Sequence, residues 1–312
     1  TATFRLDLNV PLGFGDTTAL RVMQRTSSAV AWDTVGTVAS YAAGLLNQAG
    51  IDKFGQFAIG VGASAPPPPP GKRYQGEVFS SYQIQSNIQY GDTALQVLDI
   101  YSGTGDTVKN RPLVIFVPGG GFKGVNAPGG FSDLVCGGLA KRGYLVAFIR
   151  YYRTKSSIPN DTVHFETMLK ALQDVKAAVR FFRKNGAGYG IDTSQIFMTG
   201  SSAGSITALH LAYLDSAEVP KYVNWSNVGG TFEGNDRGSA GYSSRIRAVI
   251  SNWGAIGDTA WMKIGDPPVF AVHGLTDLTV FYEQVPADGP FLYGSKHIIA
   301  AAQRLGIPSG VR

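Results

Sequence analysis

Continuous apolar runs and longer stretches of helical spacing alternate along most of the chain. Residues 112–117 and 144–149 are uninterrupted runs of aliphatic and aromatic side chains, which is typical of strands buried on both faces of a sheet. A long helix is predicted after the second run, ending near residues 185–186, and its apolar face consists of Phe165, Met168, Leu169, Leu172, Val175, Val179 and Phe182. Strands that alternate with helices predict an α/β fold with a mostly parallel central sheet flanked by helices.

Two segments with period-two alternation precede these runs. Residues 82–88 and 94–101 alternate apolar and polar side chains, and Tyr-Gly-Asp-Thr at 90–93 supplies a turn between them. The pattern predicts a pair of antiparallel strands, each exposed on one face. Near the other end of the chain, residues 295–306 have the spacing of an amphipathic helix that ends at a glycine.

Five consecutive prolines, residues 66–70, separate the N-terminal part of the chain from the rest. They cannot enter a helix or a central strand and are expected to form a stiff polyproline II spacer of ~15 Å. We therefore expect an N-terminal segment of unknown role at 1–65, a proline-rich linker at 66–75 and a larger domain at 76–312. A long surface loop inside a single domain is the alternative.

Within the N-terminal segment two kinds of periodicity occur. Apolar and polar residues alternate over 4–10, which predicts a strand, whereas the apolar residues between 38 and 46 have helical spacing. The second pattern predicts a helix that ends near Gly50. Its apolar residues are Val38, Tyr41, Ala42, Leu45 and Leu46.

Ser202 is the candidate nucleophile. It lies in Gly-Ser-Ser-Ala-Gly at 200–204, directly after the apolar run 196–199 and before the helix-like stretch 205–211. A G-x-S-x-G serine between a strand and a helix becomes exposed and reactive, because the flanking glycines leave room for a sharp, strained turn. The short pattern recurs by chance in glycine-rich chains, so the prediction depends on its context. The side chain of the neighbouring Ser201 is expected to point elsewhere.

A glycine-rich loop, Pro-Gly-Gly-Gly-Phe at 118–122, follows the first buried run. Three consecutive glycines place bare backbone N–H groups at a strand end, where they can bind the oxyanion of a tetrahedral acyl intermediate. Each such donor typically contributes ~3 kcal/mol of transition-state stabilisation. An ordinary glycine-rich turn is the alternative, but a strand that leads into such a loop ahead of the serine turn favours an oxyanion hole.

Residues from about 90 to 312 resemble an α/β-hydrolase of the carboxylesterase and hormone-sensitive-lipase-like kind. The resemblance rests on the glycine loop 119–122, the stretch 171–180 that leads to Tyr-Gly-Ile-Asp at 189–192, the serine motif, and the segment 267–277. It implies an α/β-hydrolase fold and a serine carboxylester hydrolase that acts through an acyl-enzyme.

The resemblance also implies roles for individual residues. Ser202 would be the nucleophile, Asp277 the acid of the catalytic triad, and the backbone N–H groups of Gly120, Gly121 and Ala203 the oxyanion hole. The chain departs from the family at two positions, since it carries Pro118 where the family usually has His and Ser205 where many members have Gly. Neither departure removes a predicted donor.

In this family the general base is a histidine in a loop after the last strand, and the chain contains four histidines. His164 falls on the long helix, His210 on the helix after Ser202, His273 directly before the acid loop, and His297 on the amphipathic helix 295–306. We expect His297 to be a surface residue of that helix and none of the four to be the base. Residues 307–312 look like the approach to a final strand. The sequence therefore predicts that the C-terminal strand and the catalytic histidine are missing, which would leave the chain nearly inactive by itself.

Two assignments have local alternatives. Asp277 follows a strand and could simply cap the next turn with its carboxylate. Asp266 is a rival for the acid, but it precedes that strand and would lie at the wrong end for the site. For the substrate pocket, Phe122 and Trp253 are the candidates, because both are aromatic residues in loops near the catalytic edge; lid and core roles fit them as well.

Composition narrows the remaining possibilities. The net charge is +5, but the 27 Lys and Arg residues are scattered, which argues against a nucleic-acid site. No apolar run approaches the ~20 residues of a membrane span. Cys136 is the only cysteine and is expected to be buried in a helix. Spacing of His and Cys supports no metal site, and we predict no cofactor.

The partner expected from these features is a small-molecule or polymeric ester, and partner proteins stay open. The second function considered is a non-catalytic binding or adhesion protein on a hydrolase scaffold, since a fold alone does not guarantee activity. Secretion or a periplasmic location is a further hypothesis, because the chain begins at Thr1 and a proline spacer suits an exported protein. Removal of an expression tag would explain the first observation equally well.

Overall fold

The structure is a computed structural model that describes residues 72–124, 127–154, 160–234, 239–283 and 292–312, together with the backbone of six short strands nearer the N-terminus. The chain divides into two compact units, Thr1–Pro70 and Gly71–Arg312. In the first unit, the described strands form two three-stranded antiparallel sheets. One sheet consists of β1 (Ala2–Asp7), β5 (Leu45–Ile51) and β4 (Ser40–Ala42), and the other of β3 (Asp33–Thr34), β2 (Leu20–Arg25) and β6 (Gln56–Val61).

The strand predicted near the N-terminus is confirmed as β1, while residues 8–10 lie outside the described residues. The helix predicted over residues 38–46 is wrong, because β4 and β5 occupy this region and pair antiparallel. Tyr41 lies opposite Leu46 and Ala42 opposite Leu45. Residues that would share one helical face are therefore cross-strand neighbours, and short apolar spacings do not distinguish the two arrangements.

Only the end of the predicted linker falls in the described part of the chain. Residues 66–71 lie outside it, and residues 72–75 are part of the second unit. The backbone N–H of Tyr74 donates to the carbonyl of Arg142 at 2.9 Å, and Arg73 forms an ion pair with Asp106.

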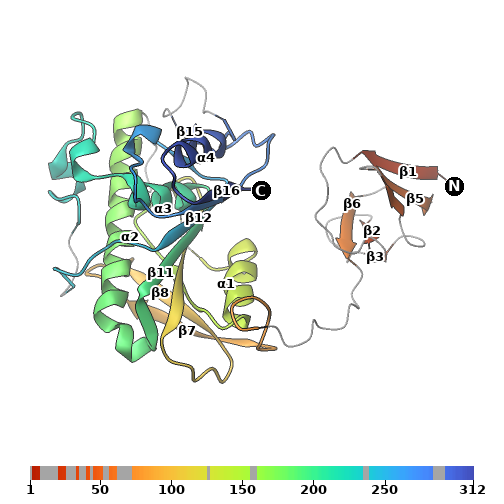
Figure 1. The fold of residues 1–312 in the computed structure, drawn as a ribbon, viewed down its shortest axis with the longest axis horizontal. Helices are drawn as coiled ribbons and strands as arrows, with labels where there is room; N and C mark the ends of the chain where they lie inside the picture. Colours follow the sequence, from red (N-terminus) through yellow and green to blue (C-terminus); the bar gives the residue numbers. More distant parts are fainter. Residues whose placement is uncertain are drawn as a thin grey trace. The chain divides into compact units, whose positions relative to one another are not determined.

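The second unit is built on an eight-stranded sheet (Figure 1). In spatial order its strands are β7 (Tyr82–Gln89), β8 (Val97–Gly103), β10 (Leu145–Ile149), β9 (Arg111–Val117), β11 (Ile191–Ser201), β12 (Ala248–Asn252), β14 (Val269–Val272) and β16 (Ser309–Val311). In this order every neighbouring pair from β10 to β16 is parallel, whereas β8 is antiparallel to both β7 and β10. The mostly parallel sheet expected from the sequence is therefore confirmed.

Helices cover both faces of this sheet, with α1 (Phe131–Lys141) on one side and α2 (Asp161–Tyr189) on the other (Figure 1). The helix α3 (Ala203–Tyr213) packs on the same face as α2. Strand β9 is apolar after its first residue because both of its faces are buried: Val114 and Phe116 join the core under α1, whereas Ile115 and Val117 join the core under α2 and α3. Cys136 is buried in α1, as predicted.

The helix α2 extends past its predicted end. A Cβ at Gly186 would lie 2.3 Å from the side chain of Thr193, so this glycine permits close packing against β11 instead of ending the helix. The chain leaves α2 at Gly190, which has the left-handed φ of 64° that favours glycine at a helix end.

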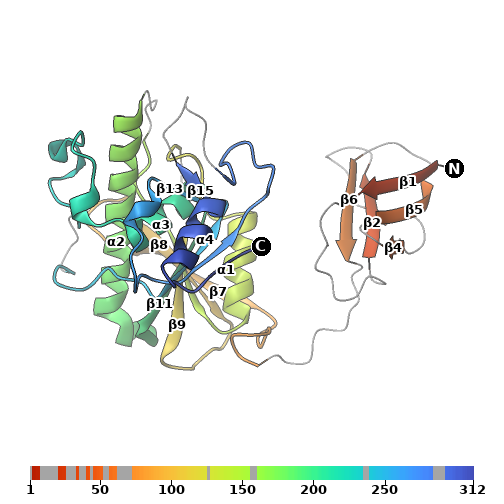
Figure 2. The same cartoon turned by 45° about the horizontal axis from the view of Figure 1, so that its top comes forward.

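The C-terminal elements agree with the predicted amphipathic helix. This helix is α4 (Ser295–Arg304), and Gly306 follows it with φ 68°. The short strands β13 (Ala255–Ile256) and β15 (Tyr293–Gly294) pair next to its start (Figure 2). Residues 309–311, within the stretch expected to approach a final strand, form β16 beside β14.

Candidate active site

Ser202 connects β11 to α3 in a strained turn. Its backbone has φ 51° and ψ −124°, a region that residues with a side chain rarely adopt. The N–H of Ser202 donates to the carbonyl of Asn252 at 3.0 Å, and its own carbonyl accepts from Ile206 at 2.9 Å. Hydrogen bonds to β12 and to the first turn of α3 therefore hold the turn, which presents the serine at the carboxyl end of the parallel strands.

The two glycines of the motif are required by close backbone contacts. A Cβ at Gly200 would lie 2.6 Å from the carbonyl carbon of Gly204, and a Cβ at Gly204 would lie 2.0 Å from the carbonyl oxygen of Val117. Real Cβ atoms essentially never approach backbone this closely. The turn thus brings the start of α3 directly against the end of β9, where the glycine loop begins.

The glycine loop lies against the serine turn. The N–H of Gly119 donates to the hydroxyl of Ser201 at 3.1 Å, and a Cβ at Gly119 would lie 2.6 Å from the carbonyl oxygen of Ser201. The expectation that Ser201 points away from the site is therefore wrong: its hydroxyl contacts the predicted oxyanion loop.

The backbone of the loop turns sharply after this contact. Gly120, Gly121 and Phe122 have φ values of 128°, 61° and 58°. Among the described residues, none accepts a hydrogen bond from the N–H groups of Gly120, Gly121 or Ala203. Backbone N–H groups at a strand end and at a helix start that have no hydrogen-bond acceptor among the described residues can bind an anion.

Asp277 follows β14 and caps its own loop. Its Oδ1 accepts from the N–H groups of Thr279 at 2.8 Å and Val280 at 3.0 Å, so the turn-capping role considered from the sequence is present. Its Oδ2 lies 3.8 Å from Nε2 of His273. Strands β11 and β14 are both parallel to β12, so Ser202 and Asp277 follow strand ends at the same edge of the sheet.

Two of the four histidines, His273 and His297, contact residues other than Ser202. His273 is buried, and its ring nitrogens lie 2.8 Å from the hydroxyl of Ser295 and 2.8 Å from the carbonyl of Val280. His297 is partly exposed on α4, as predicted, and its ring packs edge-on against Tyr293 at 5.5 Å. Within the described residues, no histidine hydrogen-bonds Ser202.

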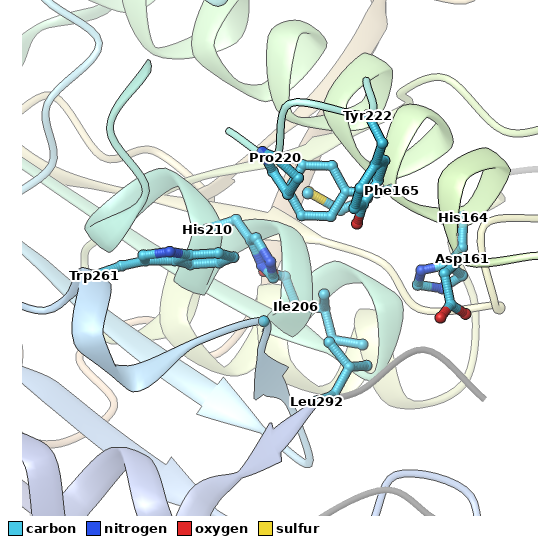
Figure 3. A pocket seen from close by; sticks show the side chains of 11 residues that line it. Asp161, His164, Phe165, Ile206, His210, Pro220, Tyr222, Trp261 and Leu292 are labelled. Carbon is cyan, nitrogen blue, oxygen red and sulfur yellow. The ribbon is translucent and has the colours of Figure 1, made fainter. Parts of the chain in front are cut away.

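The other two histidines line a cavity of about 200 Å³ between α2, α3 and the segment 257–261 (Figure 3). Ile206 and His210 lie one and two turns after Ser202 on α3, so the cavity starts beside the serine turn. Its walls consist of Asp161, His164, Phe165, Met168, Ile206, His210, Pro220, Tyr222, Gly257, Trp261 and Leu292.

The two imidazoles of this cavity are neutral near pH 7. Burial lowers the pKa of His210 to about 4, and burial also lowers the pKa of His164. Nδ1 of His210 lies 2.7 Å from the carbonyl of Ile206 and is therefore the protonated nitrogen of the neutral ring. The aromatic rings of Phe165 and Trp261 pack edge-on around this histidine at 6.3 and 5.4 Å.

The aromatic residues proposed for the pocket do not line this cavity. Phe122 is buried and packs edge-on against His164 at 5.4 Å, and Trp253 packs against Phe131 at 4.9 Å. Sequence reasoning missed Ile206 and His210, although their spacing of four and eight residues from Ser202 places them on one face of the following helix.

No helix in the described part of the chain has both the length and the apolar character needed to cross a membrane. The described ranges also contain no group of three or more His, Cys, Asp or Glu side chains placed to hold a metal ion.

Comparison with known proteins shows a family to which the chain is similar. The BD-FAE family model matches residues 98–265, more than half of the chain. A probable isoprenylcysteine alpha-carbonyl methylesterase of Oryza sativa subsp. japonica is 34% identical over 148 residues, which is 45% of this chain and 31% of the relative. The esterase LipC of Mycobacterium tuberculosis is 30% identical over 144 residues, 45% of this chain and 32% of the relative. The chain thus spans about a third of the length of these curated relatives.

Solved structures share the fold. The thermophilic esterase Est2 of the Planctomycetes species Thermogutta terrifontis, with butyrate bound, superposes with a TM-score of 0.52 at 17% identity, covering 74% of this chain and 82% of the esterase. A truncated carbohydrate esterase from gut microbiota gives a TM-score of 0.51 at 18% identity, covering 77% and 89%.

Proposed function

The chain belongs to the BD-FAE family of α/β-hydrolase carboxylesterases, and from this premise we propose that it hydrolyses carboxylic esters with Ser202 as the nucleophile. The observation that carries the proposal is the strained backbone of Ser202, with φ 51° and ψ −124°, between β11 and α3. Such strain persists only where surrounding structure enforces it, and here the contacts of Gly200 and Gly204 do so.

The proposed reaction has two stages. The Ser202 hydroxyl oxygen attacks the ester carbonyl carbon while a general base takes its proton, and the N–H groups of Gly120, Gly121 and Ala203 stabilise the oxyanion. Collapse of this intermediate breaks the bond to the alcohol, which leaves with the proton and yields an acyl-enzyme. Water then attacks the acyl-enzyme by the same route and releases the carboxylic acid. Asp277 is assigned to orient the base and to stabilise its protonated form.

The cavity beside α3 supplies the proposed binding site for one part of the ester. Its walls are mostly apolar and aromatic, and its two imidazoles are neutral at pH 7. Phe165, Tyr222 and Trp261 offer ring faces and edges to an apolar or aromatic acyl or alcohol group. The ester could be a small molecule or part of a polymer. A cavity of about 200 Å³ suits one acyl or alcohol group of it better than a longer stretch of a polymer.

Replacement of the nucleophile tests the proposal. In the full-length protein, Ser202→Ala is expected to lower kcat on a p-nitrophenyl ester by more than roughly 10⁴-fold with KM little changed, because the nucleophile acts mainly in the transition state. Ser194→Ala is the matched control, since this exposed serine is on the same strand and only bonds Asp192.

Residual activity above about a tenth of wild type in Ser202→Ala would reject the assignment. A wild-type protein with no serine-dependent ester hydrolysis would instead favour the alternative, a binding protein on a hydrolase scaffold.

A further inference from the structure

The guanidinium of Arg153 lies behind the glycine loop and binds its carbonyl groups. Arg153 follows β10, and its Nη2 donates to the carbonyls of Pro118, at 3.3 Å, and of Gly119. Its Nη1 donates to the carbonyl of Lys123 at 3.0 Å. One planar side chain therefore joins the beginning and the end of the loop, which a lysine could not do with the same geometry.

The contact with Gly119 fixes the direction of one predicted oxyanion donor, the N–H of Gly120. The carbonyl of Gly119 and the N–H of Gly120 belong to one planar trans peptide unit and point in opposite directions. When Arg153 holds the carbonyl on one side of the loop, the N–H of Gly120 is held toward the other side. The orientation of this donor thus depends on a side chain outside the loop.

The loop is shaped to admit the guanidinium. A Cβ at Gly120 would lie 2.4 Å from Nη1 of Arg153, and the φ of 128° at this residue is one that L side chains rarely adopt. The absence of a side chain at Gly120 therefore makes room for the cation. A positive charge directly behind the donors also favours the negative charge that develops on the carbonyl oxygen during attack.

Arg153 is itself held in place by its neighbours. Its guanidinium lies 5.2 Å from the centre of the Tyr151 ring, and the Tyr151 hydroxyl donates to the carbonyl of Pro118 at 2.6 Å. At the residue after Arg153, the N–H of Thr154 donates to the carbonyl of Phe122 at 2.9 Å. The segment 151–154 and the glycine loop are therefore bound together at both ends.

We propose that Arg153 is a positioning residue for ester hydrolysis: it holds the carbonyls of the glycine loop so that the N–H group of Gly120 faces the oxyanion. This inference rests on the proposed function, since it assigns a role in the same reaction. Positioning predicts a loss in kcat with little change in KM, because the donors bind the transition state more strongly than the ground state.

The test compares Arg153→Ala and Arg153→Lys in the full-length protein on a p-nitrophenyl ester. Arg153→Ala is expected to lower kcat by roughly 10- to 100-fold with KM within about threefold of wild type. Arg153→Lys retains the charge but not the fork of donors, so we expect it to lose at least about fivefold. Added guanidinium chloride, at concentrations that do not unfold the protein, is expected to restore at least about fivefold of the kcat of Arg153→Ala by occupying the vacated position.

Arg150→Ala is the matched control. This arginine leaves the same strand three residues earlier but binds both oxygens of the buried Asp99, at 3.1 and 2.8 Å, on the opposite edge of β10. Its replacement is expected to lower the melting temperature, to leave kcat within about threefold and to show no response to guanidinium.

The outcomes separate this inference from the proposed function. If wild-type activity does not depend on Ser202, the proposed function fails. If activity depends on Ser202 but both Arg153 variants keep kcat within about threefold, or lose it without recovery by guanidinium, the positioning role is overturned and the proposed function stands. Should Arg153→Ala not fold, the kcat of Arg153→Lys decides by the same threefold limit.

Discussion

The hydroxyl of Ser201 accepts a hydrogen bond from the backbone N–H of Gly119 at 3.1 Å. This contact joins the residue before the proposed nucleophile to the first glycine of the proposed oxyanion loop, 82 positions away in sequence. It also occupies the N–H of Gly119, so the oxyanion is left to the donors that follow. The distance between the serine turn and the loop is therefore set by a side chain that takes no part in the bond-making steps.

Ser201→Ala is expected to lower kcat by roughly three- to tenfold with KM nearly unchanged. Loss of the hydroxyl leaves the Gly119 N–H without its acceptor and loosens the loop against the turn, which costs about 0.6 to 1.4 kcal/mol of transition-state stabilisation. Steady-state kinetics on a p-nitrophenyl ester measure the effect, with Ser194→Ala as control. A kcat within twofold of wild type would show that the contact does not influence the reaction.

Gly204→Ala is expected to prevent formation of the native turn. The added methyl would lie 2.0 Å from the carbonyl oxygen of Val117, which belongs to the buried strand β9 and cannot move aside. We expect a loss of several kcal/mol in unfolding free energy, measured by urea denaturation, and no detectable hydrolysis.

Gly188→Ala is the matched control for this change. A Cβ at this exposed position of α2 meets nothing within 4 Å, so alanine should stabilise the helix by about 0.5 to 1 kcal/mol. Equal effects of the two substitutions would contradict the close-packing argument.

Much of the fold could be predicted from the sequence because strands that are buried on both faces of the sheet consist mostly of consecutive apolar residues. Every residue of β9 is buried, and residues 112–117 of this strand are an unbroken apolar run. The glycine loop and the serine turn could also be predicted, since the glycines that permit each sharp turn lie within a few residues of one another in the chain. Gly186 misled the prediction of the end of α2, because its role is contact with Thr193 rather than helix termination.

Contacts between distant segments could not be predicted in this way. The cavity joins α2, α3 and the segment 257–261, and none of these stretches has a pattern that distinguishes a cavity wall from ordinary core. Arg153 follows the glycine loop by about thirty residues, and nothing around it in the sequence indicates that it binds Gly119. Such residues are identified only after the topology has brought β9 and β10 side by side.

Asp277→Asn separates catalysis from turn capping. Asparagine keeps an oxygen that can accept from the N–H groups of Thr279 and Val280, so the melting temperature should change little. A neutral amide cannot stabilise a protonated base, and kcat/KM is expected to fall by roughly 10²- to 10⁴-fold.

Asp266→Asn is the control for this substitution. Asp266 also caps a turn, accepting from the N–H of Lys263 at 2.6 Å, but it precedes β14 and lies at the other end of the strand. Activity that is retained in Asp277→Asn, as in Asp266→Asn, would leave Asp277 with the capping role alone.

His210 and Asp174 are buried groups whose pKa values are displaced in opposite senses. Burial lowers the pKa of His210 from 6.5 to about 4 and raises the pKa of Asp174 from 3.8 to about 6. Between pH 6.5 and 4 the unfolded chain binds a proton at His210 that the folded protein does not bind, so His210 removes stability as the pH falls. Between pH 3.8 and 6 the folded protein holds more protons at Asp174 than the unfolded chain, so Asp174 removes stability as the pH rises.

Single substitutions should therefore change the pH dependence of stability in opposite directions. The unfolding free energy of wild type minus that of His210→Gln is expected to fall by about 2 to 3 kcal/mol as the pH drops from 6.5 to 4. The same difference for Asp174→Asn is expected to rise by about 2 to 3 kcal/mol as the pH drops from 6 to 4. Urea denaturation at half-unit pH intervals measures both, because any effect of a substitution that is independent of pH shifts a curve without changing its slope. Slopes of the same sign, or two flat differences, would show that these side chains are not held in their buried, neutral-favouring surroundings.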